Sequence, residues 1–136
     1  MLSEVQYGNG GKIRYGYDEY DRLVGISDDG DDPVNFPTVE YSYGANGKVA
    51  EEYDHWNARK RTFAYDMSER LCQEKEISGF GPISYQADYG YDKYGNLVRL
   101  TEHIFGSPSP YITNYTYDND NRPTAIQYGA DTRKVE

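Results

Sequence analysis

The sequence predicts an all-β protein: an antiparallel meander of repeated β-hairpins that forms a curved, twisted sheet. Three observations predict it: an aromatic motif that recurs five times, period-two alternation before the motif, and turn-forming residues after it. Helical periodicity does not persist for three turns, and its closest approach, residues 50–60, is interrupted at residues 54–57. We expect about ten to twelve short strands in a single array that spans residues 1–136.

The motif has two aromatic residues that flank one small residue. An Asp usually follows, with a basic and then an apolar residue four and five positions after it. The second tyrosines are separated by 26, 22, 26 and 26 residues, which is too regular for chance, and partial copies flank the array at residues 7–13 and 128–135. The aromatic pairs are Tyr15 and Tyr17, Tyr41 and Tyr43, Phe63 and Tyr65, Tyr89 and Tyr91, and Tyr115 and Tyr117.

Each motif predicts the first strand of a hairpin. Two aromatic residues two positions apart point to the same face of a strand. The residue between them is always small, so the opposite face has room for another layer or a close backbone. The alternation extends backwards in the fourth copy through Tyr85 and Ala87 and in the fifth through Tyr111 and Thr113, which is the period-two pattern of a half-buried strand.

The residues after the aromatic pair predict a tight turn and a return strand. The Asp carboxylate can accept backbone N–H bonds, and the residue three positions later is usually one that tolerates positive φ. This fits a type I turn that ends in a left-handed residue. Glu69 departs from the pattern, so we expect a distorted third turn, and Pro123 should break the fifth copy. The repeat positions are Asp18, Arg22, Leu23, Lys48, Val49, Asp66, Arg70, Leu71, Asp92, Gly95, Asn96, Leu97, Asp118, Asn121 and Arg122.

The segments between copies vary more than the copies themselves. Residues 27–38 are predicted to form an exposed acidic loop, and residues 76–84 and 106–110 to form turns. The four aspartates of the first loop are a candidate calcium site, although their spacing does not match an EF-hand and a solvated loop is the favoured interpretation. They are Asp28, Asp29, Asp31 and Asp32.

Composition limits the classes of function. The chain has 16 Tyr, whereas Leu, Ile, Val and Phe together number 23, so tyrosine must supply much of the buried surface. A net charge of −9 argues against nucleic acid and against anionic membrane surfaces. No stretch is long and apolar enough for a membrane span, and no secretion signal is visible. Cys72 is the one cysteine and is expected to be a small hydrophobe in a strand.

The motif Tyr-x-Tyr-Asp-x-x-Gly-Arg-Leu resembles the YD repeat, also called the Rhs repeat, most closely at residues 15–23 and 89–97. Families with this repeat include bacterial Rhs and wall-associated polymorphic toxins, shells of insecticidal toxin complexes, and teneurins. The resemblance implies β-hairpins in a long spiralling sheet that acts as a non-catalytic scaffold. It also implies an extracellular or cell-surface location. Expected partners are other repeats of a larger chain or edge-to-edge copies of this one, and no cofactor is expected.

A carbohydrate-binding module is the alternative function. Aromatic faces stack on sugar rings, but the regular tyrosine rows are better explained as core and cross-strand pairs. Candidates outside the rows are Tyr53, His55 and Trp56, followed by Tyr20 and Tyr94.

A hydrolase is the least favoured function. His55 and His103 are isolated, and no catalytic or metal-binding spacing appears. The recurring Arg and Asp residues are expected to pair along the sheet as a structural ladder.

Overall fold

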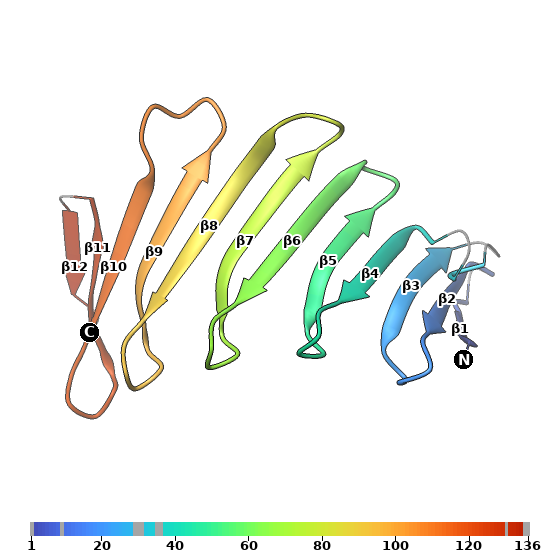
Figure 1. The fold of residues 1–136 in the computed structure, drawn as a ribbon, viewed down its shortest axis with the longest axis horizontal. Helices are drawn as coiled ribbons and strands as arrows, with labels where there is room; N and C mark the ends of the chain where they lie inside the picture. Colours follow the sequence, from blue (N-terminus) through green and yellow to red (C-terminus); the bar gives the residue numbers. More distant parts are fainter. Residues whose placement is uncertain (1, 9, 29–31, 35–36, 130, 135–136) are drawn as a thin grey trace. The chain divides into compact units, whose positions relative to one another are not determined.

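The computed structural model describes residues 2–8, 10–28, 32–34, 37–129 and 131–134, and these form β-strands and no helix (Figure 1). No helix that could cross a membrane therefore occurs among these residues. The strands are β1 (Leu2–Gln6), β2 (Lys12–Tyr17), β3 (Leu23–Asp28), β4 (Val39–Tyr43), β5 (Val49–Asp54), β6 (Arg59–Tyr65), β7 (Leu71–Ser78), β8 (Ile83–Tyr91), β9 (Leu97–Ile104), β10 (Tyr111–Tyr117), β11 (Pro123–Tyr128) and β12 (Asp131–Lys134).

The strands follow one another in the sheet in the order of the chain, from β1 to β12. Pairing is antiparallel in each register that is described, for example β2 with β3 and β8 with β9. The predicted all-β fold, an antiparallel meander of hairpins, is therefore confirmed. Asn9, Ala130 and Val135 of the predicted partial copies lie outside the described residues.

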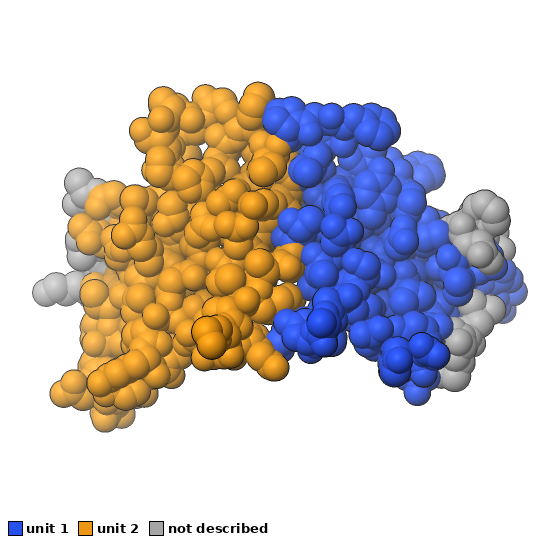
Figure 2. Space-filling view, in the orientation of Figure 1, with its two compact units in different colours: residues 1–62, 77–82 blue, residues 63–76, 83–136 orange. Residues whose placement is uncertain are grey.

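The chain divides into two compact units, which are coloured separately in Figure 2. Unit 1 comprises residues 1–62 and 77–82, and unit 2 comprises residues 63–76 and 83–136. Unit 1 contains β1 to β5 and unit 2 contains β8 to β12. The features below are described within one unit or the other.

The predicted turn geometry recurs in the hairpins. In the first copy the Asp18 amide donates to the Arg22 carbonyl at 2.9 Å and the Asp21 amide donates to the Asp18 carbonyl at 3.2 Å. Asp21 has φ of 59°, and the register shifts between Gly16 and Tyr17. Tyr17 lies opposite Leu23 and Gly16 lies opposite Gly25, so Val24 is the extra residue of a β-bulge on the return strand.

Two sequence expectations about these turns are wrong. The third turn is not distorted, because Glu69 adopts the same left-handed conformation, with φ of 62°, and its amide donates to the Asp66 carbonyl at 2.9 Å. Pro123 does not break the fifth copy, because it opens β11, where a missing donor is tolerated. Asn121 and Asp118 still form the turn bond, at 3.1 Å.

The repeat tyrosines are half-buried, whereas Ala87 in β8 is fully buried. They pair across strands with apolar residues, as Tyr89 does with Leu100 and Tyr15 with Ile26. The second copy differs, because Tyr41 lies opposite Glu52. Tyrosine therefore supplies contact area on a sheet face, as its abundance predicted, without full burial.

The segment after β3 is only partly the exposed loop that the sequence predicted. Ser27 belongs to β3 and is fully buried, as is Pro33. Pro33 packs against a glycine of β3, where a Cβ added at Gly25 would lie 1.7 Å from the Pro33 carbonyl oxygen. A Cβ at Gly16 would lie 2.8 Å from Val34. Gly16, which lies between Tyr15 and Tyr17, therefore admits a close backbone as its position predicted, whereas Gly25 lies in the return strand β3 and was not part of that prediction.

Candidate functional site

In the first, third, fourth and fifth copies the hairpin turn is held by the carboxylate of its Asp residue. In the third copy, Asp66 Oδ1 accepts the backbone N–H groups of Ser68 at 2.8 Å and Arg70 at 3.0 Å. Its Oδ2 accepts Nε and Nη2 of Arg70, at 2.8 and 2.7 Å. Asp18 and Arg22 form the same bidentate pair. The Asp and Arg residues therefore pair within one hairpin, and the predicted ladder of pairs along the sheet is wrong for these two copies.

These bonds favour the ionised carboxylate. The backbone N–H and then the side chain of Arg70 hold the pKa of Asp66 below its usual value. The side chain and then the backbone of Asn57 do the same for Asp54 in the turn after β5. The carboxylates are thus engaged in turn structure, which leaves them poorly suited to proton transfer near neutral pH.

The arginine also contacts the next copy. The Arg70 guanidinium lies 4.5 Å from the ring centroid of Tyr91, in a cation–π arrangement. The Tyr91 hydroxyl donates to the carbonyl of Leu71, the residue after that arginine, at 2.8 Å. We call this arrangement of tyrosine and preceding hairpin the inter-repeat link.

The inter-repeat link recurs in both units. In unit 1 the Tyr43 hydroxyl donates to the Leu23 carbonyl at 2.6 Å, and Arg22 lies 4.5 Å from the ring centroid of Tyr43. In unit 2 the Tyr117 hydroxyl donates to the Leu97 carbonyl at 2.9 Å. In each case the bond reaches back 20 residues. The second tyrosines of the second, fourth and fifth copies therefore join their strands to the preceding hairpin.

The fourth and fifth copies vary the turn chemistry. Asn96 replaces arginine, and its side-chain amide donates to Asp92 Oδ2 at 3.0 Å and to Asn121 Oδ1 at 2.9 Å. Arg122 forms an ion pair with Asp120, at 3.2 Å, and Asp120 is not one of the recurring aspartates of the predicted ladder. The backbone N–H of Arg122 still donates to Asp118. A hydrogen bond between the side-chain amides of Asn96 and Asn121 in neighbouring turns thus replaces the contact between arginine and tyrosine.

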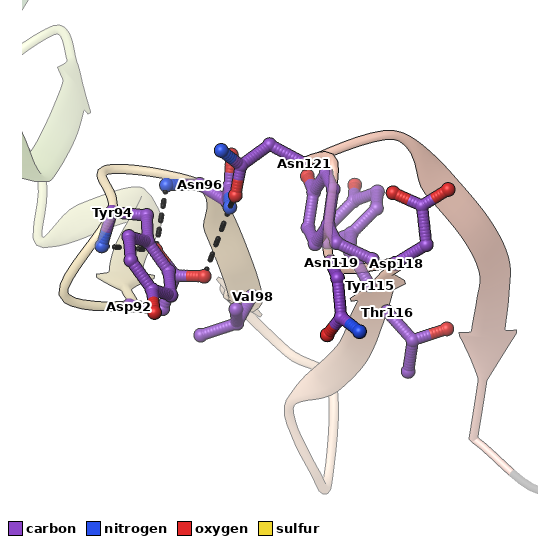
Figure 3. A pocket seen from close by; sticks show the side chains of 10 residues that line it. Asp92, Tyr94, Asn96, Val98, Tyr115, Thr116, Asp118, Asn119 and Asn121 are labelled. Atoms are coloured by element: carbon purple, nitrogen blue, oxygen red, sulfur yellow. Dashed lines mark hydrogen bonds between the residues drawn. The ribbon is translucent and has the colours of Figure 1, made fainter.

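A cleft of about 570 Å³ lies between these two turns in unit 2. Figure 3 shows the side chains of Asp92, Tyr94 and Asn96 on one side and those of Asn119 and Asn121 on the other. Tyrosine, amide and carboxylate groups together line the cleft, which is a combination suited to a ligand with several hydroxyl groups. The lining residues are Asp92, Tyr94, Asn96, Val98, Tyr115, Thr116, Tyr117, Asp118, Asn119 and Asn121.

The sugar-binding candidates of unit 1 are only partly brought together. The His55 ring meets the Tyr53 ring edge-on, with centroids 4.5 Å apart, and His55 Nε2 lies 3.2 Å from Glu40 Oε2. Tyr53 also lines a cavity of about 290 Å³ with Glu40, Ser42, Glu51 and Lys60. Trp56 is not among the residues that line this cavity and is 86% exposed on the turn before β6.

Tyr20 and Tyr94 occupy equivalent turn positions and are largely exposed. A cation lies over each ring: Arg22 is 5.1 Å from the Tyr20 centroid and Lys93 is 4.7 Å from the Tyr94 centroid. Tyr94 lines the cleft of unit 2. Of these two candidates, the structure therefore favours Tyr94 as a ligand contact.

The calcium candidates do not gather into a described site. The Asp28 carboxylate accepts the Thr38 hydroxyl at 2.9 Å, and the Asp32 carboxylate accepts the Val34 amide at 2.9 Å. Asp29 and Asp31 lie outside the described residues. No group of three or more His, Cys, Asp or Glu side chains that could hold a metal occurs within the described ranges.

Cys72 and His103, which the sequence did not assign to catalysis, lie in different strands. Cys72 is half-buried in β7, and His103 Nε2 lies 3.6 Å from Asp88 Oδ2.

Sequence reasoning missed a tyrosine–carboxylate pair in unit 2, where the Tyr85 hydroxyl donates to Glu102 at 2.9 Å. Burial, followed by this hydrogen bond, raises the pKa of Tyr85. Neither partner belongs to the repeat motif, so its spacing carried no signal for this pair.

The fold and the inter-repeat links define an all-β protein built from repeated hairpins. Comparison with protein-family models and with curated proteins finds no match for the chain. The resemblance to the YD repeat therefore stays a prediction that rests on the sequence motif.

Proposed function

We propose that the chain is a non-catalytic structural repeat module, as in a segment of a YD-repeat shell or of a secreted or cell-surface protein. The observation that carries this proposal is the inter-repeat link formed by Tyr43, Tyr91 and Tyr117. The hydroxyl groups of these recurring tyrosines join one hairpin to the next. This is the arrangement that a scaffold requires.

The proposed partners are further hairpins of the same kind, either in a longer chain or at the edge of a second copy. In a repeat sheet each hairpin contacts mainly its neighbours, so stability is the sum of hairpin terms and interface terms. An extracellular or cell-surface location is part of the same proposal and rests on the sequence resemblance.

Hydrogen exchange measured by mass spectrometry tests the scaffold role. In Tyr117→Ala we expect faster amide exchange in β10 and also in β9, whose Leu97 carbonyl the tyrosine hydroxyl reaches. Tyr111→Ala is the matched control, because Tyr111 lies in the same strand and is largely exposed. Equal exchange of β9 in the two variants would remove the support for a scaffold held by inter-repeat links.

Carbohydrate binding is the second candidate function, and the cleft of unit 2 is the observation that favours it. The ring of Tyr94 offers a stacking surface on one side of the cleft, and the amides of Asn119 and Asn121 lie on the other side. A glycan array tests this proposal, with Tyr94→Ala and Trp56→Ala compared with Tyr20→Ala. Loss of a glycan signal in Tyr94→Ala alone would support the cleft, whereas loss in Trp56→Ala alone would move the site to unit 1. An array without signal would reject this candidate.

A further inference from the structure

Another cleft of unit 2, of about 500 Å³, is lined by residues of β9, β10 and β11. Its lining is mostly apolar, and among the described residues that line it Glu102 is the one with a charged side chain. The volume falls within the roughly 300–1,000 Å³ that is usual for small-molecule sites. None of the described residues that line it belongs to the cleft between the turns. We call it the Glu102 cleft, and Ile104, Pro110, Tyr111 and Tyr128 also line it.

Glu102 lies on a largely apolar part of one sheet face. It is directly opposite Ala87 of β8 on one side and Tyr111 of β10 on the other. Residues directly opposite one another share a face, and so do residues two positions apart in a strand. Leu100 and Ile104 therefore flank Glu102 on the same face, and Ala87 is fully buried. A carboxylate among such neighbours is costly to desolvate unless a cation or hydrogen-bond donors compensate its charge.

A tyrosine hydroxyl is the donor that the Glu102 carboxylate contacts. The Tyr85 hydroxyl donates to Glu102 Oε1 at 2.9 Å, and this is the hydrogen bond that Glu102 accepts from the described residues. Burial, and after it neighbouring groups that include Glu102, raises the pKa of Tyr89 and of Tyr115. The negative charge of Glu102 therefore acts on neutral side chains of β8 and β10. Its Oε2 is left for a donor that enters the cleft.

Two glutamates of unit 1 are compensated in a way that Glu102 is not. Glu4 lies opposite Arg14 and forms an ion pair with it at 2.9 Å. Glu52 lies opposite Arg61 and also forms an ion pair with it. The two positions opposite Glu102 hold alanine and tyrosine, and no Lys, Arg or His in the described ranges forms an ion pair with Glu102. A ligand with a positive charge would supply the partner that the neighbouring strands lack.

Exposed tyrosine rings and apolar side chains form the rest of the Glu102 cleft. Tyr111 is 58% exposed and Tyr128 is 49% exposed. The faces of aromatic rings attract organic cations, so the Tyr111 ring beside Glu102 favours the same charge as the carboxylate does. Ile104 and Pro110 offer apolar contacts. The cleft thus combines one anionic group, an aromatic ring next to it and an apolar wall.

This combination matches one class of ligand. An anion would be repelled by Glu102, and a ligand with many hydroxyl groups would leave several of them unpaired against the apolar wall. We propose that the Glu102 cleft binds an organic cation, a protonated primary amine that carries an apolar group. Its ammonium group donates to Glu102 Oε2 beside the Tyr111 ring, and its apolar group contacts Ile104 and Tyr128.

Titration of the ¹⁵N-labelled full chain with 2-phenylethylammonium chloride, followed by nuclear magnetic resonance, tests the proposal. We expect saturable shifts of amide signals in β9 and β10 around the cleft. The neutral alcohol 2-phenylethanol has nearly the same shape and should bind at least about tenfold more weakly, because a hydrogen bond between charged groups is stronger than one between neutral groups. Equal affinity for the alcohol would overturn the proposal, and so would the absence of saturable shifts with millimolar amine.

Glu102→Gln keeps the shape of the side chain and an acceptor for the Tyr85 hydroxyl, and should weaken amine binding about tenfold. Asp88→Asn is the matched control, because it removes the same charge from the opposite face of β8. It should bind the amine like the unmodified chain. Equal weakening by the two substitutions would overturn the proposal, because binding would then follow net charge alone.

Tyr111→Leu tests the ring beside the ammonium group. Leucine keeps an apolar wall and lacks the aromatic face, so binding of the amine should weaken about two- to fivefold and binding of the alcohol should not. Equal changes for the two ligands would overturn the placement of the ammonium group at this ring. Thermal melts followed by circular dichroism establish that each variant is folded, and the comparison of amine with alcohol on the unmodified chain needs no variant.

Discussion

Removal of one hydroxyl group measures how much the inter-repeat link contributes to the free energy of unfolding. Tyr91→Phe deletes the hydrogen bond to the Leu71 carbonyl, which is 2.8 Å long, and keeps the ring over which Arg70 lies. Such a bond contributes about 1 kcal/mol to the free energy of unfolding. Tyr91→Ala also removes half-buried ring packing and the cation–π contact, so its total cost should be about 3 kcal/mol.

The assay is urea and thermal unfolding followed by far-ultraviolet circular dichroism, which reports the strands of the whole chain. For a domain of this length, a loss of 1 kcal/mol corresponds to about 3–5 °C in Tm. Tyr91→Phe should therefore lower the Tm by this amount, and Tyr91→Ala by roughly three times as much. An unchanged slope of free energy against urea would show that compactness is preserved.

Tyr94→Phe is the control, because that ring is 68% exposed and lies three residues away. It should leave the Tm unchanged within error. The reasoning is refuted if Tyr91→Phe is as stable as the unmodified chain, because the hydroxyl bond would then contribute nothing. It is also refuted if Tyr91→Phe is as destabilising as Tyr91→Ala, because ring packing would then have no share.

Three further predictions concern the turns and the close backbone contact. Gly25→Ala should cost about 1–3 kcal/mol, because its Cβ would lie 1.7 Å from the Pro33 carbonyl oxygen. Gly90→Ala, whose Cβ would meet ordinary contacts of 3.5 Å, should change the unfolding free energy little; equal costs would contradict the packing argument. Glu69→Gly should raise the free energy of unfolding by about 0.5–1 kcal/mol, because the residue has φ of 62°, and a lower Tm in this variant would be evidence against strain. The pKa of Asp66 is lower in the folded chain than its ordinary value of 3.8, so its stabilising effect is present above that value and is lost as the pH falls through the lowered pKa. Melts between about pH 5 and pH 2 should show this loss, and Asp66→Asn should reduce the dependence on pH.

Most of the strand and turn structure could be predicted because it follows from local chemistry. The aromatic alternation identified the first strand of each hairpin, and Asp18, Asp66 and Asp92 marked the turns that follow. Glu69 was misjudged because the carboxylate of Asp66 and the paired strands impose the turn on whatever residue occupies the left-handed position. Local preference is a weak guide where the surrounding hydrogen bonds determine the conformation.

The contacts between copies could not be predicted in the same way. The motif indicated that arginine and aspartate would pair, but not that Arg70 would also lie over Tyr91. That contact depends on how far the guanidinium extends across the sheet, which sequence spacing does not contain. Pro33 was placed in an exposed loop because its neighbours are acidic, whereas the space beside Gly25 determines its burial. Trp56 was grouped with Tyr53 because both lie outside the repeat pattern, although only Tyr53 lines the cavity.

The reach of each inter-repeat link has a consequence for how the chain acquires its structure. Because the tyrosine hydroxyl bonds to a carbonyl only 20 residues earlier, a hairpin gains its stabilising neighbour as soon as one more copy has been synthesised. Contacts of such short sequence separation favour rapid folding. The array can therefore fold in the order in which it leaves the ribosome, each finished hairpin serving as the template on which the next one docks.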